Sequence, residues 1–200
     1  MTYEFEHKAH EEGFAVVCGV DEAGRGPLAG PVYAAAVILP DGLEDMGIND
    51  SKKMSEKKRE ALFDIIIENA TAYGRGFATE TEIDEINILN ATFLAMRRAV
   101  EAMGVKPDLV LVDGNRKPNT GYEEITLVKG DAKSISISAA SILAKVSRDR
   151  LLTEYDEKYP QYNFKKHKGY GTKEHTDLIL KYGPCEIHRL SFLKKLLGEK

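Results

Sequence analysis

The chain has 200 residues, of which 42% are hydrophobic and 30% are charged, with seven prolines and two cysteines. This composition excludes collagen-like, disordered and disulfide-rich secreted proteins, and a chain of this length buries enough surface to form a hydrophobic core. The longest apolar stretch, residues 31–40, is shorter than the ~20 residues that cross a bilayer, and the polar N-terminus has no signal-peptide pattern. We therefore expect a globular cytoplasmic protein that does not contact a membrane.

The net charge of −4 is unevenly distributed along the chain. Residues 1–140 contain 15 Lys and Arg against 24 Asp and Glu, a balance of −9, whereas residues 141–200 contain 13 against 8, a balance of +5. A basic C-terminal part beside an acidic body is compatible with a phosphate-binding face. Solvated helix faces would produce the same asymmetry, so charge alone does not identify a partner.

The first half of the chain contains alternating strand and helix patterns. Two apolar runs, residues 14–20 and 33–39, predict strands joined by a segment rich in glycine and proline. Residues 54–69 predict a helix because their apolar side chains share one stripe, and residues 71–78 predict a third strand. Thr79 and Glu82 then form the pattern of a capping box, which predicts a helix up to residue 103.

The second half continues the alternation. Residues 109–112 form a fully apolar run, typical of a strand buried on both faces, and residues 125–128 predict another strand. Helices are expected at 134–157, 172–182 and 191–197. This order predicts an α/β fold with a mixed sheet flanked by helices. We expect a single domain over residues 1–200, with a core at about 14–157 and a basic loop with C-terminal helices at 158–200.

Acidic residues follow three of the apolar runs. Asp21 and Glu22 follow the first, Asp113 follows the fourth, and Asp131 follows the fifth. In α/β sheets, sites form beyond the carboxyl ends of the strands, and carboxylate oxygens are ligands that Mg²⁺ and Mn²⁺ prefer. Each acid alone would equally suit a turn or a helix N-cap. Together they predict a divalent-cation site at one edge of the sheet.

Glycines follow the first pair of acids, in the triplet Gly24-Arg25-Gly26. Neighbouring residues of a regular strand point to opposite faces, so Asp21 and Glu22 can serve one site only if the backbone bends, which these glycines permit. The triplet also allows close approach of a ligand, and Arg25 suits a phosphate. It is neither a dinucleotide fingerprint nor a Walker loop, because prolines follow it and the Gly-Lys-Ser/Thr ending is missing.

The sequence resembles bacterial ribonuclease HII over most of its length. The matching segments lie in the family's order at residues 19–32, 50–53, 88–92, 112–114, 129–131, 139–149, 167–172 and 188–192. The triplet at 24–26 distinguishes it from the sister family, ribonuclease HIII. One departure is Glu186, where the family usually has proline, and we expect this to change only a local turn.

The resemblance implies a ribonuclease H-like fold with a mixed five-stranded sheet. It implies hydrolysis of the RNA strand of RNA–DNA hybrids, and incision 5′ of single ribonucleotides embedded in duplex DNA. We expect a monomer, because nothing in the sequence suggests a dimer seam. Asp21, Glu22, Asp113 and Asp131 correspond to the catalytic, metal-binding carboxylates. The cofactor would be Mg²⁺ or Mn²⁺, with one ion held without substrate and a second arriving with the scissile phosphate.

The resemblance also implies which residues bind substrate. The backbone at Gly24, Arg25 and Gly26 would contact the ribose 2′-hydroxyl, and Tyr170 would stack on a neighbouring sugar. Other expected contacts to the duplex are the phosphate-binding lysines and three further polar residues: Lys52, Lys53, Lys165, Lys166, Lys168, Ser141, Lys145 and Asn90. The five histidines lack metal-ligand spacing, and a structural or phosphate-facing role is expected for them.

Two other classes of function use the same residues. One is another nuclease or a resolvase of the same fold, acting on a different substrate. The other is a non-catalytic binding module whose acids hold a structural ion. Cleavage of duplexes with and without one embedded ribonucleotide separates these alternatives.

Overall fold

The computed structural model describes residues 2–43, 47–48 and 54–198. The predicted contact segment at residues 50–53, which includes Lys52 and Lys53, lies outside the described residues. The helices are α1 (Glu4–Glu11), α2 (Glu56–Asn69), α3 (Glu80–Ala102), α4 (Ile135–Lys158), α5 (Phe164–His167), α6 (Lys173–Tyr182) and α7 (Leu190–Leu197). The strands are β1 (Val17–Ala23), β2 (Val32–Ile38), β3 (Ala72–Ala78), β4 (Leu109–Asp113) and β5 (Glu123–Leu127).

The five strands form one mixed sheet in the order β3-β2-β1-β4-β5, which confirms the predicted sheet. β1 is antiparallel to β2 and parallel to β4, while β2 is antiparallel to β3 and β4 is parallel to β5. The register pairs Val20 with Val112. Asp21 and Asp113, the next residues on these strands, therefore lie side by side at the same edge of the sheet.

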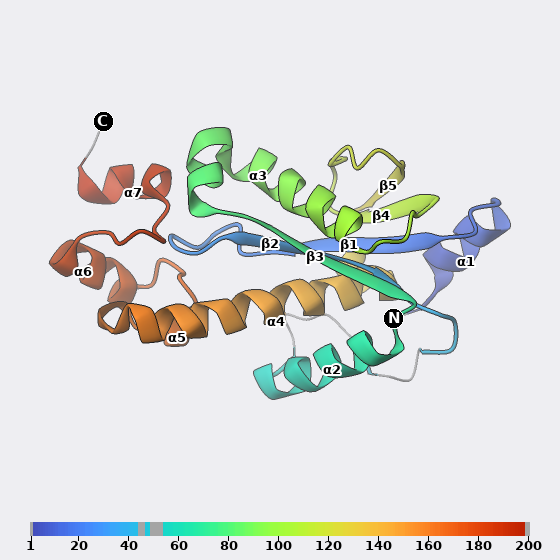
Figure 1. Ribbon diagram of the computed structural model, residues 1–200, viewed down its shortest axis with the longest axis horizontal. Coiled ribbons are helices and arrows are strands. Elements are labelled where there is room, and N and C mark those ends of the chain that lie inside the picture. The colour runs from blue at the N-terminus through green and yellow to red at the C-terminus, as the bar shows by residue number, and fades with distance from the viewer. Residues whose placement is uncertain (1, 44–46, 49–53, 199–200) are drawn as a thin grey trace.

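Helices cover both faces of the sheet (Figure 1). α3 lies on one face, where its apolar residues pack against Val20 and Val112, and α2 and α4 lie on the other, where Ile66 and Ile142 pack against Ala35. The sheet and α4 approach closely, because a Cβ atom at Gly19 would lie 2.2 Å from the carbonyl carbon of Ser136. Strand β1 and the first turn of α4 are thus held against one another.

The C-terminal helices gather at one end of the molecule, at the left of Figure 1. They enclose a separate apolar cluster that includes Ala29, Tyr162, Phe164 and Ile179. This confirms the expected C-terminal helical extension. The segment between α4 and α6, expected to be a loop, contains a short 3₁₀ helix at Pro160–Tyr162 and helix α5.

The bounds of two strands differ most from the sequence-based expectation. β1 starts at Val17, because the N–H groups of Ala15 and Val16 donate to the carboxylate of Asp108, and it continues through the acids to Ala23 by pairing with β2. β5 starts at Glu123, two residues early. Helix α1 was not expected at all.

Helix α3 begins with the predicted capping box, in which the Thr79 side chain accepts from the N–H of Glu82 and the Glu82 carboxylate accepts from the N–H of Thr79. The helix is interrupted at Asn87, whose φ is +65°. The Asn87 side-chain oxygen accepts from the N–H groups of Leu89 and Asn90, which restarts the helix after the kink.

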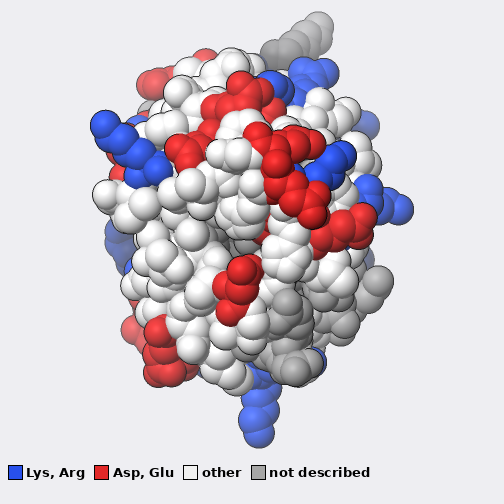
Figure 2. Space-filling view, turned by 90° about the vertical axis from the view of Figure 1, so that its right-hand side faces the viewer, with Lys and Arg blue, Asp and Glu red and all other residues white. Residues whose placement is uncertain are grey.

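None of the helices in the described part of the chain is both long and apolar enough to cross a membrane. The end of the molecule opposite the C-terminal helices is shown in Figure 2, where Asp and Glu side chains gather in a band across the upper part of the face. Negative charge in this band disfavours the approach of an anionic partner to that part of the face.

Candidate active site

A pocket of about 450 Å³ lies at the carboxyl ends of β1 and β4. Its lining comes from β1, the loop that follows it, α2, β4, α4 and the loop before α6. The lining residues are Asp21, Glu22, Ala23, Gly24, Arg25, Gly26, Arg59, Asp113, Ser141, Lys145 and Tyr170. Most of the predicted site residues are therefore brought together in one place.

Asp21 is the most buried of the acids in this pocket, with 3% of its surface exposed. Its carboxylate accepts from the N–H of Glu22 at 2.7 Å and from the side chain of Ser141. Burial, together with the negative charges of Glu22 and Asp113, raises the pKa of Asp21 well above its usual value. A bound cation would relieve this repulsion.

Asp113 and Asp131 are linked through the backbone. The Asp113 carboxylate accepts from the N–H of Gly130 at 2.6 Å and from that of Asp131 at 3.4 Å. Asp131 lies in the 3₁₀ helix Gly130–Ala132 and is 6% exposed, but it does not line the pocket. Within the described ranges, no three acidic, His or Cys side chains are grouped closely enough to hold an ion on their own. An ion here would need water or substrate oxygens as further ligands, as Mg²⁺ often does.

Asp21 and Glu22 both line the pocket, although the strand does not bend between them as the sequence suggested. Asp21 pairs with Ala35 and Glu22 with Ala34, and the chain turns only at Gly24, whose φ is +94°. The Glu22 carboxylate lies 3.4 Å from Nη1 of Arg25. The pocket lies across the end of β1, so residues from both faces of the strand border it.

Two buried arginines hold the loop that follows these acids, which we call the GRG loop (residues 24–31). Arg189 donates to the carbonyls of Gly24 at 2.6 Å, Arg25 at 3.0 Å and Gly30 at 2.8 Å. Burial lowers the pKa of Arg189 to about 9.

The second arginine, Arg148, donates to the carbonyls of Ala29 at 2.8 Å, Pro31 at 3.0 Å and Lys168 at 2.9 Å. Burial lowers the pKa of its guanidinium to about 10. Sequence reasoning assigned no role to either arginine, although both lie in segments that match the ribonuclease HII pattern. Their presence in these matching segments, without an assigned function, was the only sign in the sequence that the two arginines have a role.

Tyr170 lies on the other side of the pocket and is 43% exposed. Its N–H donates to the carbonyl of His167 at 2.9 Å, and its carbonyl lies 2.9 Å from Nδ1 of His175. Lys145 Nζ lies 5.9 Å from the centre of its ring. The ring therefore faces the pocket while its backbone is held by buried histidines.

Those histidines form a chain of contacts beneath Tyr170. The rings of His167 and His175 stack with centroids 4.2 Å apart, and the Nε2 atoms of His175 and His188 are 3.1 Å apart. Burial lowers the pKa of both His175 and His188 to about 4. The expected structural role fits these buried, neutral imidazoles.

Two of the lysines in the basic loop have side-chain partners within the protein. The ammonium of Lys166 lies 2.7 Å from Glu174, and that of Lys168 lies 3.1 Å from the Thr153 hydroxyl. In the described part of the chain, the Lys165 side chain is in no ion pair. Asn90 donates to the carbonyl of Ile86 and does not line the pocket.

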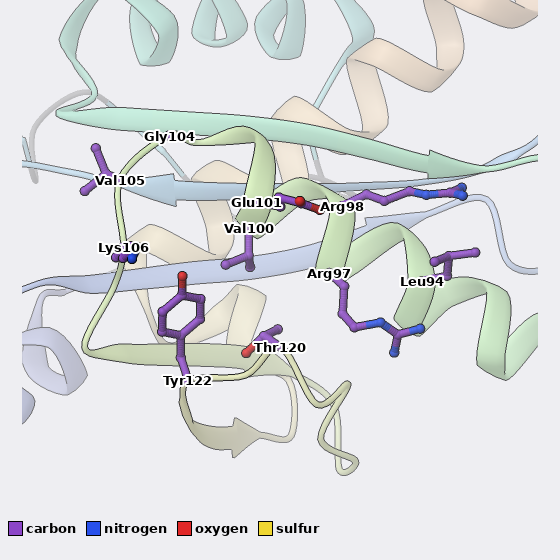
Figure 3. Close-up of a pocket in the computed structure, with 10 residues that line it drawn as sticks. All are labelled: Leu94, Arg97, Arg98, Val100, Glu101, Gly104, Val105, Lys106, Thr120 and Tyr122. Carbon is purple, nitrogen blue, oxygen red and sulfur yellow. The ribbon is translucent and has the colours of Figure 1, made fainter.

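A larger pocket of about 590 Å³ lies at the end of α3. Figure 3 shows it between side chains of α3, including Arg97, and the segment that carries Thr120 and Tyr122. No predicted site residue lines it. The smaller pocket, which holds the acids, is therefore the candidate active site.

Known proteins resemble this chain over nearly its full length. A family model described as Ribonuclease HII matches residues 18–195. Ribonuclease HII of Caldicellulosiruptor bescii is 57% identical over 196 residues, which cover 98% of this chain and 95% of the relative.

Solved structures agree. The crystal structure of ribonuclease H2 from Pyrococcus horikoshii OT3 matches with a TM-score of 0.76 and 30% identity, over 91% of this chain and 97% of the other. The ribonuclease HII in the PCNA complex from Archaeoglobus fulgidus matches with a TM-score of 0.73 and 25% identity, over 92% and 98%. With this fold and these sequence matches, the chain belongs to the ribonuclease HII family, endoribonucleases of class EC 3.1.26.4 that act on RNA–DNA hybrids.

Proposed function

We propose that this enzyme incises duplex DNA on the 5′ side of a single embedded ribonucleotide, in addition to cutting the RNA strand of hybrids. The products would carry a 3′-hydroxyl on DNA and a 5′-phosphate on the ribonucleotide. The observation that supports this is the pocket itself, which places the carboxylates of Asp21, Glu22 and Asp113 beside the Gly24–Gly26 backbone and Tyr170. Chemistry and ribose recognition would then occur within one cavity.

The residues present fit divalent cations. The candidate ligands, Asp21, Glu22, Asp113 and Asp131, offer only carboxylate oxygens, which suit Mg²⁺ or Mn²⁺ and not zinc. When bound, a pair of such ions activates the attacking water and stabilises the leaving oxygen. We propose that one ion binds the protein alone and that the second arrives with the scissile phosphate.

The protein's own groups would position the strand. Lys145, which lines the pocket and pairs with Asp149 at 2.8 Å, provides positive charge near the phosphate. The half-exposed ring of Tyr170 offers a surface for stacking on a sugar. A 2′-hydroxyl both donates and accepts, so backbone groups at residues 24–26 would distinguish ribose from deoxyribose.

Other duplex contacts would carry no base information. Lys52, Lys53 and the lysines of the basic loop would bind backbone phosphates, which fixes the position of the duplex without reading its sequence. We propose that the enzyme acts as a monomer on ribonucleotide-containing DNA in the cytoplasm.

The test is cleavage of a duplex that contains one ribonucleotide, with each strand end labelled in turn and the product ends identified by mass. The matched controls are the same duplex without the ribonucleotide and a full RNA–DNA hybrid. Cutting 5′ of the ribonucleotide, with 3′-hydroxyl and 5′-phosphate ends, is the expected result. A 2′,3′-cyclic phosphate, or cutting only within runs of several ribonucleotides, would contradict the proposal.

Two variants of Tyr170 test ribose recognition in the same assay. Tyr170→Phe keeps the ring and loses one hydroxyl, which is expected to weaken transition-state binding by about 1–3 kcal/mol if a buried partner loses its hydrogen bond. Tyr170→Ala also removes the ring and is expected to have the larger effect. Equal activity of Tyr170→Ala and the unmodified enzyme would show that Tyr170 has no role in substrate recognition.

A further inference from the structure

The GRG loop is held by side chains that lie far away in the sequence. Figure 1 shows the turn between β1 and β2 next to the segment that leads into α7, at the left end of the sheet. Arg189 and Arg148 are 0% and 1% exposed, and all six of their described hydrogen bonds go to backbone carbonyls. Neither guanidinium lines the pocket.

The hydrogen bonds of Arg189 fix the orientation of two peptide planes. None of the described peptide bonds is cis, and in a trans peptide the N–H points opposite to the C=O. The carbonyls of Gly24 and Arg25 point toward Arg189. The N–H groups of Arg25 and Gly26, which belong to the same two planes, therefore point away from the buried guanidinium.

Arg148 links the same loop to the segment of Tyr170. Its guanidinium joins the carbonyls of Ala29 and Pro31 to that of Lys168, two residues before Tyr170. The Leu28 N–H also donates to the carbonyl of Gly169 at 2.8 Å. The GRG loop and the segment before Tyr170 are thus one hydrogen-bonded unit.

Charge and shape both favour arginine at these positions. The planar guanidinium donates in several fixed directions at once, whereas a lysine ammonium is a compact charge on a flexible stem. The nearby carboxylate of Glu80 interacts electrostatically with both arginines, and its Oε1 atom has no hydrogen-bond partner among the described residues. Lysine would keep the positive charge but could not reach three carbonyls at the same time.

We propose that Arg189, supported by Arg148, is a positioning residue for ribonucleotide recognition, because it aims the N–H groups of Arg25 and Gly26 toward the substrate side of the GRG loop. This inference rests on the proposed recognition of a ribose 2′-hydroxyl by that loop. The arginines act through the loop and do not touch the reacting atoms.

The test compares Arg189→Lys with the unmodified enzyme on two duplexes, one with a single ribonucleotide and one with a 2′-fluoro nucleotide at the same position. The measured quantity is the ratio of the two kcat/KM values, together with the Mg²⁺ concentration for half-maximal activity. We expect the ratio to fall by about tenfold or more, and the Mg²⁺ requirement to stay unchanged. A loss of folded enzyme alone would lower both kcat/KM values equally and leave the ratio intact.

Arg97→Lys is the matched control. Arg97 also donates to a loop carbonyl, that of Pro118 at 2.8 Å, but it lines the other pocket. Its ratio should equal that of the unmodified enzyme. Should Arg189→Lys not fold, Arg148→Lys provides a second comparison, because it breaks the supporting hydrogen bonds to Ala29 and Pro31 of the same loop and the link to Lys168.

The outcomes separate the two proposals. If the unmodified enzyme does not prefer the ribonucleotide over the 2′-fluoro nucleotide, the proposed recognition of the 2′-hydroxyl is wrong. If it does, and Arg189→Lys or Arg148→Lys retains the full ratio, the positioning role is wrong. A reduced ratio in Arg97→Lys as well would also contradict it, since the effect would not be specific to the GRG loop.

Discussion

The guanidinium of Arg148 occupies the space that a side chain on residue 24 would need. A Cβ atom built on Gly24 would lie 2.0 Å from Nε of Arg148, and Gly24 has a φ of +94°. Glycine is therefore required at this position both for its backbone conformation and for the close approach of the arginine.

Gly24→Ala is expected to destabilise the fold and to remove most activity. Overpacking against Arg148 adds about 1–3 kcal/mol to the strain of the positive φ. Gly13→Ala is a matched control, because Gly13 has a φ of +99° but a Cβ atom placed on it would have no neighbour within 4 Å. Urea unfolding measures the loss of stability in both variants. An equal loss would show that Arg148 moves away from the added methyl group without destabilising the fold.

Replacing Asp21 or Asp113 by asparagine is expected to reduce kcat by about a hundredfold or more, because an amide binds a divalent cation more weakly than a carboxylate does. Asp21→Asn is also expected to raise the free energy of unfolding without divalent ions, since it removes a buried charge that faces two other carboxylates. Single-turnover cleavage and urea unfolding measure the two effects. Asp64→Asn, at an exposed helix position, is the control, and near-normal turnover in Asp21→Asn at saturating Mg²⁺ would contradict the assignment.

Neutralising Lys165, Lys166 and Lys168 together is expected to flatten the slope of log affinity against log salt by up to ~3 units, about 0.9 for each phosphate that the protein no longer neutralises. Lys165→Ala alone is expected to flatten the slope by about 0.9, and the further change in the triple variant measures whether Lys166 and Lys168 leave their side-chain partners to bind phosphate. Lys173→Ala, which removes a surface pair with Asp177, is the control. An unchanged slope in the triple variant would mean that these lysines do not contact the duplex.

Stability is expected to fall as the pH is lowered from about 6.5 toward about 4. Burial lowers the pKa of His175 and His188 to about 4, so in this interval the unfolded chain binds protons that the folded chain does not. Stability therefore rises with pH there, by up to about 1.4 kcal/mol for each unit of pKa difference. Urea unfolding at about pH 5 and about pH 7.5 measures the change, and His175→Gln should reduce it. Equal stability at both pH values would contradict the buried, neutral state of these rings.

Local sequence patterns were sufficient for several elements of the fold. The apolar run of β4 and the capping box of α3 depend on residues within a few positions of one another, and both are present as predicted. Helix α1 was missed because it is held in place by a contact with a residue far away in the sequence. The buried carboxylate of Glu6 accepts from the Ser134 hydroxyl at 2.6 Å, across 128 positions of sequence.

In the candidate site, too, some residues could be predicted from local sequence patterns and others could not. Asp21, Glu22 and Asp113 each follow an apolar run, and they line one pocket as that pattern predicted, whereas Asp131 lies in a 3₁₀ helix and does not line it. The common role of the four acids remains a prediction from the resemblance to a known family. The support beneath the GRG loop could not be located, because an arginine that donates to backbone carbonyls leaves no pattern in the sequence of the loop. The partners of Lys166 and Lys168 were also hidden until the loop was folded against its neighbours.

The bond between Arg189 and Gly24 joins residues 165 positions apart, and this separation has a consequence for the order of assembly. During synthesis, N-terminal segments emerge first. A growing chain that has reached α4 already contains all four acids and the whole sheet, but not the guanidinium that holds the carbonyl of Gly24. With the positioning role proposed for Arg189, selectivity for ribose would therefore require the chain up to residue 189, whereas the segments that carry the carboxylates are complete earlier.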